Sequence, residues 1–435
     1  MRPLADAERI IMVKCIPFYQ AIVACLSLTG AVALAQAPPS ETRWIAPTPE
    51  ARAFLASPPR EVLAEADAGA RPPYAARLDR LAFRSPAILG GWVARRDLSC
   101  ETCHTGGAAN VQFFVAEVSD RPGNADVTHA FWRGPREDGL ANPVNIPSLR
   151  GVRWTAPYGR DGRFFDLASF TRNVIVDEFG GAEPEPWLLD ALVAYQQALA
   201  LPPNPNLGPL GKLRPHAPAP ALRGEASFAR DCARCHVPSA AFIDRSSHDV
   251  GTGGVFDTPS LLGLAETAPY FHDGRAADLD AAIAHFDRVL GLGYDAKERA
   301  DMHAYLAAVG AVEGARAPRT LAGDLADIRD FANLLDEPLA DEDVAGADVI
   351  SAMVRRQLGR IHERFPGSGH ADVRDNLVAW SRALAGVIGM ARRHDFAPAR
   401  DALARWDRIV AAEAPTIEAA VPGSFYDPQS PGGSR

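Results

Sequence analysis

Two copies of the pattern C-x-x-C-H restrict what this chain can fold into. They are CETCH at residues 100–104 and CARCH at residues 232–236. This is the pattern to which c-type haem is attached. The two thiols of one copy lie about one helical turn apart and add to the vinyl groups of one haem, and the histidine supplies an axial nitrogen. The sequence therefore predicts two covalently bound haems, held by Cys100, Cys103, His104, Cys232, Cys235 and His236.

The other cysteines do not change this interpretation. Cys15 and Cys25 both lie within residues 1–35, so the four motif cysteines are the only ones after that segment. A four-thiolate zinc site would use the same four thiols, but it would leave both motif histidines unexplained.

The N-terminus has the features of a secretory signal peptide. Basic residues precede an apolar run over residues 16–34, which ends in small residues that suit a cleavage site. We predict that residues 1–35 are removed and that the mature protein is periplasmic. A retained membrane anchor or lipidation at Cys25 are the alternatives. No later stretch reaches the roughly 20 apolar residues of a membrane span, so stable membrane insertion is not expected.

The region after each haem motif is repeated. TAPYGRDGR at residues 155–163 corresponds to TAPYFHDGR at residues 267–275, and a P-S-L segment precedes each, starting at Pro147 and at Pro259. Each unit contains a haem motif, a proline-rich loop, a D-G-R turn and closing helices. A self-similar sequence at a fixed offset predicts a duplicated structural module.

These features predict a mainly α fold, with two cytochrome c-like haem domains in tandem and a C-terminal helical bundle. The expected divisions are an N-terminal haem domain at 36–205, a linker at 206–221, a second haem domain at 222–312 and a helical C-terminal module at 313–435. The linker is proline-rich and lacks apolar periodicity. The formal net charge of −9 argues against a nucleic-acid partner.

The C-terminal module shows helical periodicity in its apolar residues. Three helix faces are predicted: Ile350, Met353, Val354, Leu358 and Ile361; Leu377, Trp380, Leu384, Val387 and Ile388; and Leu403, Trp406, Ile409 and Val410. The module has no cysteine, and its histidines form no ligand-like cluster. We expect it to be structural or to dock a partner.

The haem motifs, the P-S-L segments and the A-P-Y-F-H-D-G-R stretch resemble the bacterial di-haem cytochrome c peroxidase family. That family includes the methylamine-utilisation enzymes, which oxidise side chains of a partner protein. The resemblance covers about residues 90–310 and leaves out the C-terminal module. It implies that hydrogen peroxide reacts at the first haem, and that the second haem relays electrons from a small cytochrome or copper protein.

The resemblance also implies roles for single residues. The distal acid of the family follows the first D-G-R turn, where Glu178 fits best, with Asp177 as its neighbour. A carboxylate there can take a proton from one peroxide oxygen and return it to the other. The family often has a tryptophan between the haems, at a place occupied here by Arg160, so Trp154 is a candidate for the electron route.

The sixth ligand of the second haem departs from the family pattern. The peroxidases place methionine there and the methylamine-utilisation enzymes tyrosine, but the matching residue is Phe286, which cannot bind iron. We therefore predict that the neighbouring His285 binds it, the alternative being a surface histidine and a five-coordinate iron. His129 is a weaker candidate for a removable ligand on the first haem.

The family also binds calcium between its haem domains. Asn145, Thr267 and Pro269 occupy the matching positions, the last two offering backbone oxygens, and oxygen ligands suit this hard ion.

Three functions remain open at this point. The chain is a peroxide-reducing enzyme, an oxidase that uses peroxide to modify a partner protein, or a di-haem electron carrier without chemistry of its own. A carboxylate over an open iron argues against the carrier, and Phe286 does not separate the first two.

Overall fold

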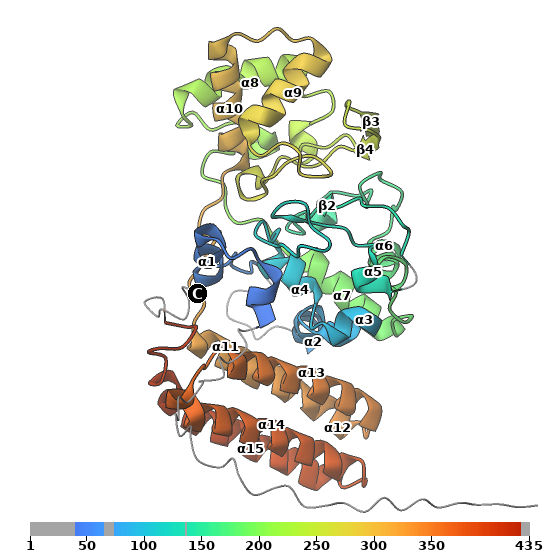
Figure 1. Ribbon diagram of the computed structural model, residues 1–435, viewed down its shortest axis with the longest axis vertical. Helices are drawn as coiled ribbons and strands as arrows, with labels where there is room; N and C mark the ends of the chain where they lie inside the picture. Colours follow the sequence, from blue (N-terminus) through green and yellow to red (C-terminus); the bar gives the residue numbers. More distant parts are fainter. Residues whose placement is uncertain (1–39, 65–73, 135–136, 428–435) are drawn as a thin grey trace, which may run out of the picture. The chain divides into compact units, whose positions relative to one another are not determined.

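The computed structural model describes residues 40–64, 74–134 and 137–427, so the predicted signal peptide at 1–35 lies outside the described residues. The described chain is mainly helical, as predicted, with two short two-stranded sheets (Figure 1). None of its helices is long and apolar enough to cross a membrane.

The first half is built from short helices joined by long loops. Its sheet pairs Asn124 with Asn145 and Ala125 with Val144 in antiparallel register. The elements are α1 (Pro49–Ala56), α2 (Tyr74–Phe83), α3 (Gly91–Arg95), α4 (Cys100–Cys103), β1 (Asn124–Ala125), α5 (Ala130–Arg133), β2 (Val144–Asn145), α6 (Leu167–Asn173) and α7 (Pro186–Ala198).

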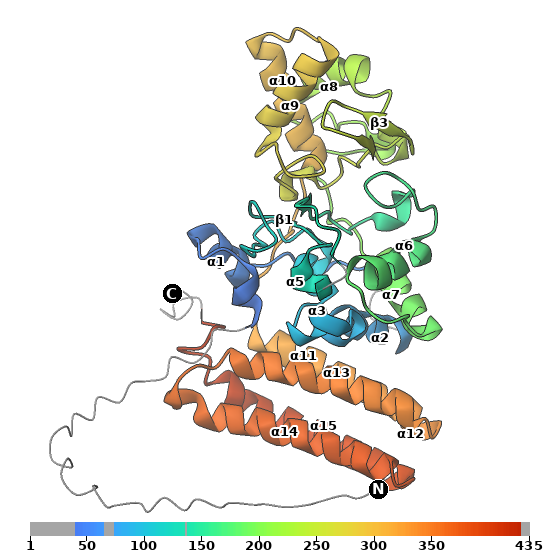
Figure 2. The ribbon, with the colours of Figure 1, turned by 45° about the vertical axis from the view of Figure 1, so that its right-hand side comes forward.

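The second half groups three helices and a sheet: α8 (Ala219–Asp231), β3 (Ser247–Asp249), β4 (Val255–Asp257), α9 (Leu279–Leu290) and α10 (Ala296–Gly310). The three helices lie together in both views (Figure 2). Gly224 lets α8 and α10 approach closely, because a Cβ atom there would lie 2.1 Å from the Asp301 carbonyl oxygen.

The C-terminal module consists of α11 (Leu321–Ala332), α12 (Asp336–Ala340), α13 (Val344–Glu363), α14 (Ala371–Ala391) and α15 (Phe396–Glu418). The three predicted faces are buried with one exception. Ile409 is 49% exposed, so its placement on the inner face was wrong. Leu403, Trp406 and Val410 recur at three- and four-residue intervals and fill the buried stripe, which leaves Ile409 beside it.

The predicted repeat is confirmed by the local structure of the two copies. Tyr158 pairs with Phe164 across the first D-G-R turn, and Tyr270 pairs with Ala276 across the second. Both copies have a cis alanine–proline bond at the same place in the T-A-P-Y segment. The helix after each turn begins at an aspartate, Asp166 for α6 and Asp278 for α9, whose carboxylate accepts a hydrogen bond from the backbone three residues on.

The apolar core divides unevenly. One cluster fills the second half, and residues 206–221, predicted as a linker, contribute Leu213, Ala217 and Ala221 to it. A larger cluster runs from Trp44 to Tyr426 and joins the first half to the C-terminal helices. The C-terminal module thus shares its core with the first half, because α11 and α13 both lie against α2.

Candidate functional site

The first haem motif forms the short helix α4. Ser99 caps it through a reciprocal pair of hydrogen bonds with Thr102, and His104 ends the turn. The Nδ1 atom of His104 lies 3.0 Å from the carbonyl oxygen of Pro147, in the first P-S-L segment. A carbonyl only accepts, so Nδ1 carries the hydrogen and Nε2 keeps its lone pair. Burial lowers the pKa of His104 to about 4, so the ring is neutral at pH 7.

The second motif repeats this arrangement. Cys232 follows directly after α8, and the Nδ1 atom of His236 lies 3.1 Å from the carbonyl oxygen of Phe242. Burial lowers the pKa of His236 as well. A backbone carbonyl that orients a histidine ring and fixes its tautomer is a common companion of metal ligation.

The residues of each motif fit a c-type haem. Each offers two free thiols and one neutral imidazole with an available Nε2 atom. Further polar atoms are buried without a hydrogen-bond partner, among them His272 Nδ1 and Asp257 Oδ1. Burial, with a smaller effect of Asp244, raises the pKa of Asp257 to about 7. Such groups are costly to bury unless a further partner completes them.

The four cysteines do not form one metal site. Among the described residues, the group with metal-ligand spacing combines Cys235 with Asp244 and His248, and no group unites the two C-x-x-C pairs. The first pair packs against the larger apolar cluster and Cys232 against the smaller one. The geometry therefore favours two separate cofactor sites over a four-thiolate zinc site.

Glu178 ends a π-helical turn that continues α6 over Val174–Glu178. Its Oε1 atom accepts a hydrogen bond of 3.2 Å from the Asn173 side chain and lies 3.7 Å from the Arg163 guanidinium. Burial raises the pKa of Glu178, and the charges of Arg163 and Arg160 oppose this rise. π-Helical turns are rare and often mark functional sites.

The neighbouring carboxylate is placed differently. The side chain of Asp177 is 59% exposed and lies 3.8 Å from the Arg172 guanidinium. Of the two predicted acids, Glu178 is therefore the less exposed, with 23% of its side chain exposed, and it is better placed for acid–base chemistry.

His285 lies on α9, where its Nε2 atom is 2.7 Å from the carbonyl oxygen of Val250. Its Nδ1 atom lies 3.4 Å from the Arg288 guanidinium. The rings of His285 and Phe286 both contact Phe271. Ligation through Nε2 would require the bond to Val250 to break, so His285 as sixth ligand stays a prediction.

Two of the predicted calcium ligands lie together. The side-chain nitrogen of Asn145 lies 2.7 Å from the Pro269 carbonyl oxygen, and the Thr267 hydroxyl binds the Leu264 carbonyl. The amide of Asn145 would have to turn to present its oxygen to an ion. At the predicted calcium site, the Asn145 side chain and the Pro269 carbonyl oxygen are therefore joined by a direct hydrogen bond between the two halves.

Arg160 lines a cavity of about 460 Å³ to which both halves contribute. Arg163 and Asp161 line it from the first D-G-R turn, and His272 and Phe256 from the second half. His272 stacks on Phe256 with 3.9 Å between the ring centroids. The cavity therefore includes Arg160, the residue at the position where the resembled family often has tryptophan.

Other predicted residues have simpler roles. Trp154 is 57% exposed, and the Arg153 guanidinium lies 4.4 Å from its ring. His129 caps α5 by accepting a hydrogen bond from the backbone of Phe131.

Sequence reasoning missed the pairing of Asp244 with His248, whose atoms are 2.7 Å apart beside Cys235. Their spacing of four residues was visible, but their approach to the haem motif depends on the β3–β4 hairpin. It also missed Asp97 and Glu101 as partners of other buried charges. The signal available was the acidic residue within the first motif, where the second has Ala233.

Comparison with known proteins finds partial likeness only. No family model matches the chain, and no curated protein matches it. Two solved structures are similar to it at 20% sequence identity. Hydrazine synthase of Kuenenia stuttgartiensis, pressurised with xenon, aligns over 66% of this chain and 99% of its own, with a TM-score of 0.41. A MauG-like protein associated with microbial copper homeostasis aligns over 58% and 92%, with a TM-score of 0.40. Likeness at this level assigns the chain to no family.

Proposed function

We propose that this chain is a periplasmic di-haem c-type peroxidase. His104 with its two cysteines would hold the haem at which hydrogen peroxide reacts, and His236 with its two cysteines the haem that relays electrons. When bound, the haems supply iron that exchanges electrons with peroxide and with a small donor protein. The observation that carries the proposal is the pair of matched motifs, each with a half-buried imidazole oriented by a backbone carbonyl.

The two repeats differ where a catalytic group is expected. In the first repeat a π-helical turn ends at the half-buried carboxyl group of Glu178, whereas α9 of the second repeat continues as a regular helix to Leu290. The Oε1 atom of Glu178 would take the proton from one peroxide oxygen and return it to the other. Arg163 and Arg160 favour the ionised form that accepts this proton. This asymmetry supports a reactive first site and a relaying second site.

The first test is haem content. The full chain, produced with a working haem-attachment system, should carry two haems that survive acid denaturation, because thioether bonds hold them. Intact-protein mass spectrometry checks this. Replacing Cys232 and Cys235 together by alanine should remove one haem and leave the other. One haem or none on the unaltered protein would contradict the proposal.

The second test is turnover. The two-haem protein should oxidise a reduced small cytochrome or copper protein when hydrogen peroxide is added, at two electrons per peroxide. No reaction with peroxide, even after prior reduction, would favour the electron carrier. Reaction with peroxide but with no small donor protein would favour oxidation of a partner protein's side chains.

A further inference from the structure

The first haem motif contains a half-buried acid that the second lacks. Glu101 lies between Cys100 and Cys103, and one oxygen of its carboxyl accepts a hydrogen bond of 3.1 Å from the backbone of Gly106. The other oxygen is buried without a hydrogen-bond partner. Burial raises the pKa of Glu101, and the charge of Arg84 is the largest effect opposing that rise. The free energy of ionising the Glu101 carboxyl, within the attachment segment, therefore depends on the charges around it.

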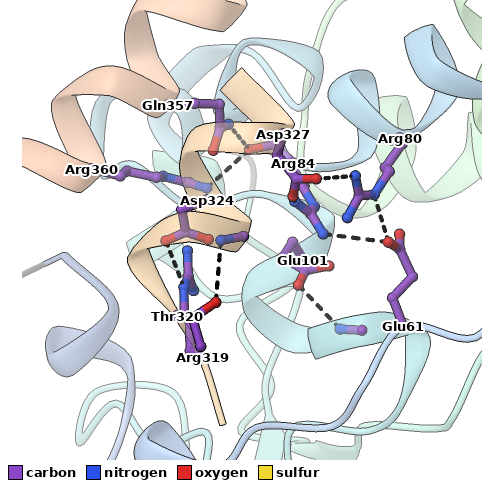
Figure 3. Close-up of polar contacts among 12 residues, drawn as sticks. Glu61, Arg80, Arg84, Glu101, Arg319, Thr320, Asp324, Asp327, Gln357 and Arg360 are labelled. Atoms are coloured by element: carbon purple, nitrogen blue, oxygen red, sulfur yellow. Dashed lines mark hydrogen bonds and ion pairs between the residues drawn. The ribbon is translucent and has the colours of Figure 1, made fainter. Parts of the chain in front are cut away.

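Those charges come from Arg84, directly after α2, from Glu61 and from the C-terminal module (Figure 3). Arg84 lies 2.8 Å from Asp327 of α11 and 3.6 Å from Glu61. Arg80 binds the same two carboxylates, each at 2.5 Å. Asp327 thus holds both arginines that face Glu61, and the side chains of Asp327, Arg80 and Arg84 are all at least three-quarters buried.

A second contact reaches the segment just before the motif. Asp97, three residues before Cys100, is 4% exposed and has a left-handed backbone with φ of 63°. Its Oδ1 atom lies 2.7 Å from Arg356 and 3.6 Å from Arg360, both on α13. An aspartate tolerates this backbone better than most residues, but it is still a strained conformation that its partners must hold.

The same face of α13 also holds Arg84. The side chains of Gln357 and Arg360 each donate a hydrogen bond of 3.0 Å to the Arg84 carbonyl oxygen (Figure 3). Together, α11 and α13 contact two residues near the first motif: Asp97, three residues before Cys100, and Arg84, whose charge acts on Glu101.

Among the described residues, no ion pair or hydrogen bond from outside its own half reaches the acid beside the second motif. Ala233 stands in place of Glu101. The acid before that motif, Asp231, binds Arg230 and the hydroxyl of Tyr294, both from the second half. In the described part of the chain, the C-terminal module therefore contacts the surroundings of the first motif and not those of the second.

We propose that the C-terminal module positions the first haem-attachment segment and sets the reduction potential of its haem, with Asp327, Arg84, Asp97 and Arg356 as positioning residues. The inference rests on the proposed first haem. Because Asp327, Arg84 and Asp97 are poorly solvated, removing one of their charges changes a field that water screens weakly. Loss of a negative charge favours the reduced haem, and loss of a positive charge disfavours it.

The experiment measures the midpoint potential of each haem in the full-length two-haem protein by optical redox titration, with spin resonance to assign the signals. Asp327→Asn should raise the potential of the first haem by about 59 mV, equivalent to a tenfold change in a one-electron equilibrium. Asp97→Asn should raise it as well. Arg356→Gln should lower the potential of the first haem, by less than Asp327→Asn raises it, because the Arg356 side chain is 49% exposed. The potential of the second haem should not change.

Asp407→Asn is the matched control. Asp407, on α15, lies 2.9 Å from Arg329 of α11, the helix that carries Asp327. Both residues of this pair belong to the C-terminal module. This variant should leave both potentials unchanged. Asp327→Glu keeps the negative charge, so the potential of the first haem should stay close to the wild-type value.

Three outcomes would overturn the proposal. Both potentials are unchanged in every variant, or Asp407→Asn shifts them as much as Asp327→Asn, or the acidic and basic variants shift the first haem in the same direction. If Asp327→Asn does not fold, the exposed Arg356→Gln variant still decides the sign. A wild-type protein without haem at the first motif would instead refute the proposed function.

Discussion

At the scale of single residues, the carboxyl groups with raised pKa values differ in what surrounds them. Glu178 is half-buried beside arginines that favour its charge. Asp79 on α2 is 2% exposed, and its Oδ1 atom has no hydrogen-bond partner. The first group is suited to exchange a proton, and the second is a cost to the fold when it ionises.

Glu178→Gln should lower peroxide turnover by about 10²–10⁴-fold, the usual contribution of a general acid–base group. The amide keeps the shape and the hydrogen bond to Asn173 but cannot carry a proton between two oxygens. Both haems and the resting spectrum should be retained. Asp177→Asn, on the exposed neighbour, is the control and should keep wild-type rates. If both variants kept the wild-type rate of peroxide turnover, Glu178 would be a structural carboxylate.

The stability of the protein should depend on pH through Asp79. Burial raises its pKa to about 7, well above the value of about 3.9 in an unfolded chain. Between these values the folded state binds more protons than the unfolded state, so stability is full below about pH 4 and falls as pH rises through 7. Asp79→Asn should remove this loss and stabilise the protein at pH 8 by on the order of 1–3 kcal/mol.

Thermal unfolding at pH 5 and pH 8 checks this prediction. Asp401→Asn, at an exposed position on α15, should show the wild-type difference between the two pH values. If Asp79→Asn kept that difference too, another group would be responsible.

At the scale of elements, the two repeats diverge after the same start. Both helices begin at a capping aspartate, but α6 ends at Asn173 and passes into a π-helical turn, while α9 continues to Leu290. The repeated sequences place Asn173 and His285 at equivalent positions, seven residues after Asp166 and Asp278. Asn173 binds Glu178, whereas His285 binds the Val250 carbonyl.

Replacing His285 by alanine tests the role of α9. If His285 is the sixth ligand of the second haem, the low-spin signal of that haem should become high-spin in the variant. His303→Ala, on α10 and bound to Asp280, is a control that should change nothing. Spin resonance of both variants measures this. An unchanged signal would leave His285 with its structural bond to Val250.

At the scale of the whole molecule, the division of the core predicts which parts fold alone. The second half has its own apolar cluster, from Leu213 to Val309. The first half shares its cluster with α11, α13, α14 and α15. The second half should therefore fold by itself. The first half should not fold stably without the C-terminal module.

A fragment of residues 203–312 should fold and carry one acid-stable haem, because it keeps its entire core and the Asn204 contacts to α10. The opposite truncation, which ends at residue 312, should lose the first haem or aggregate, since it exposes the apolar face that α11 and α13 cover. Mass spectrometry and circular dichroism measure both. A soluble truncated protein with two haems would contradict this division.

The sequence by itself determined the features that short segments encode. The haem motifs, the duplicated P-S-L and D-G-R segments and the buried stripes of α13 and α14 depend on residues within one or two turns of each other, and the structure has the repeat and the stripes as predicted. Only the tertiary structure decided how these parts meet. Arg356 and Asp97 lie 259 residues apart, and Arg84 and Asp327 lie 243 apart. A buried ion pair over such a separation leaves no local pattern, since each partner alone reads as a surface charge. The same holds for Ile409, whose exposure was set by which side of α15 the other helices cover.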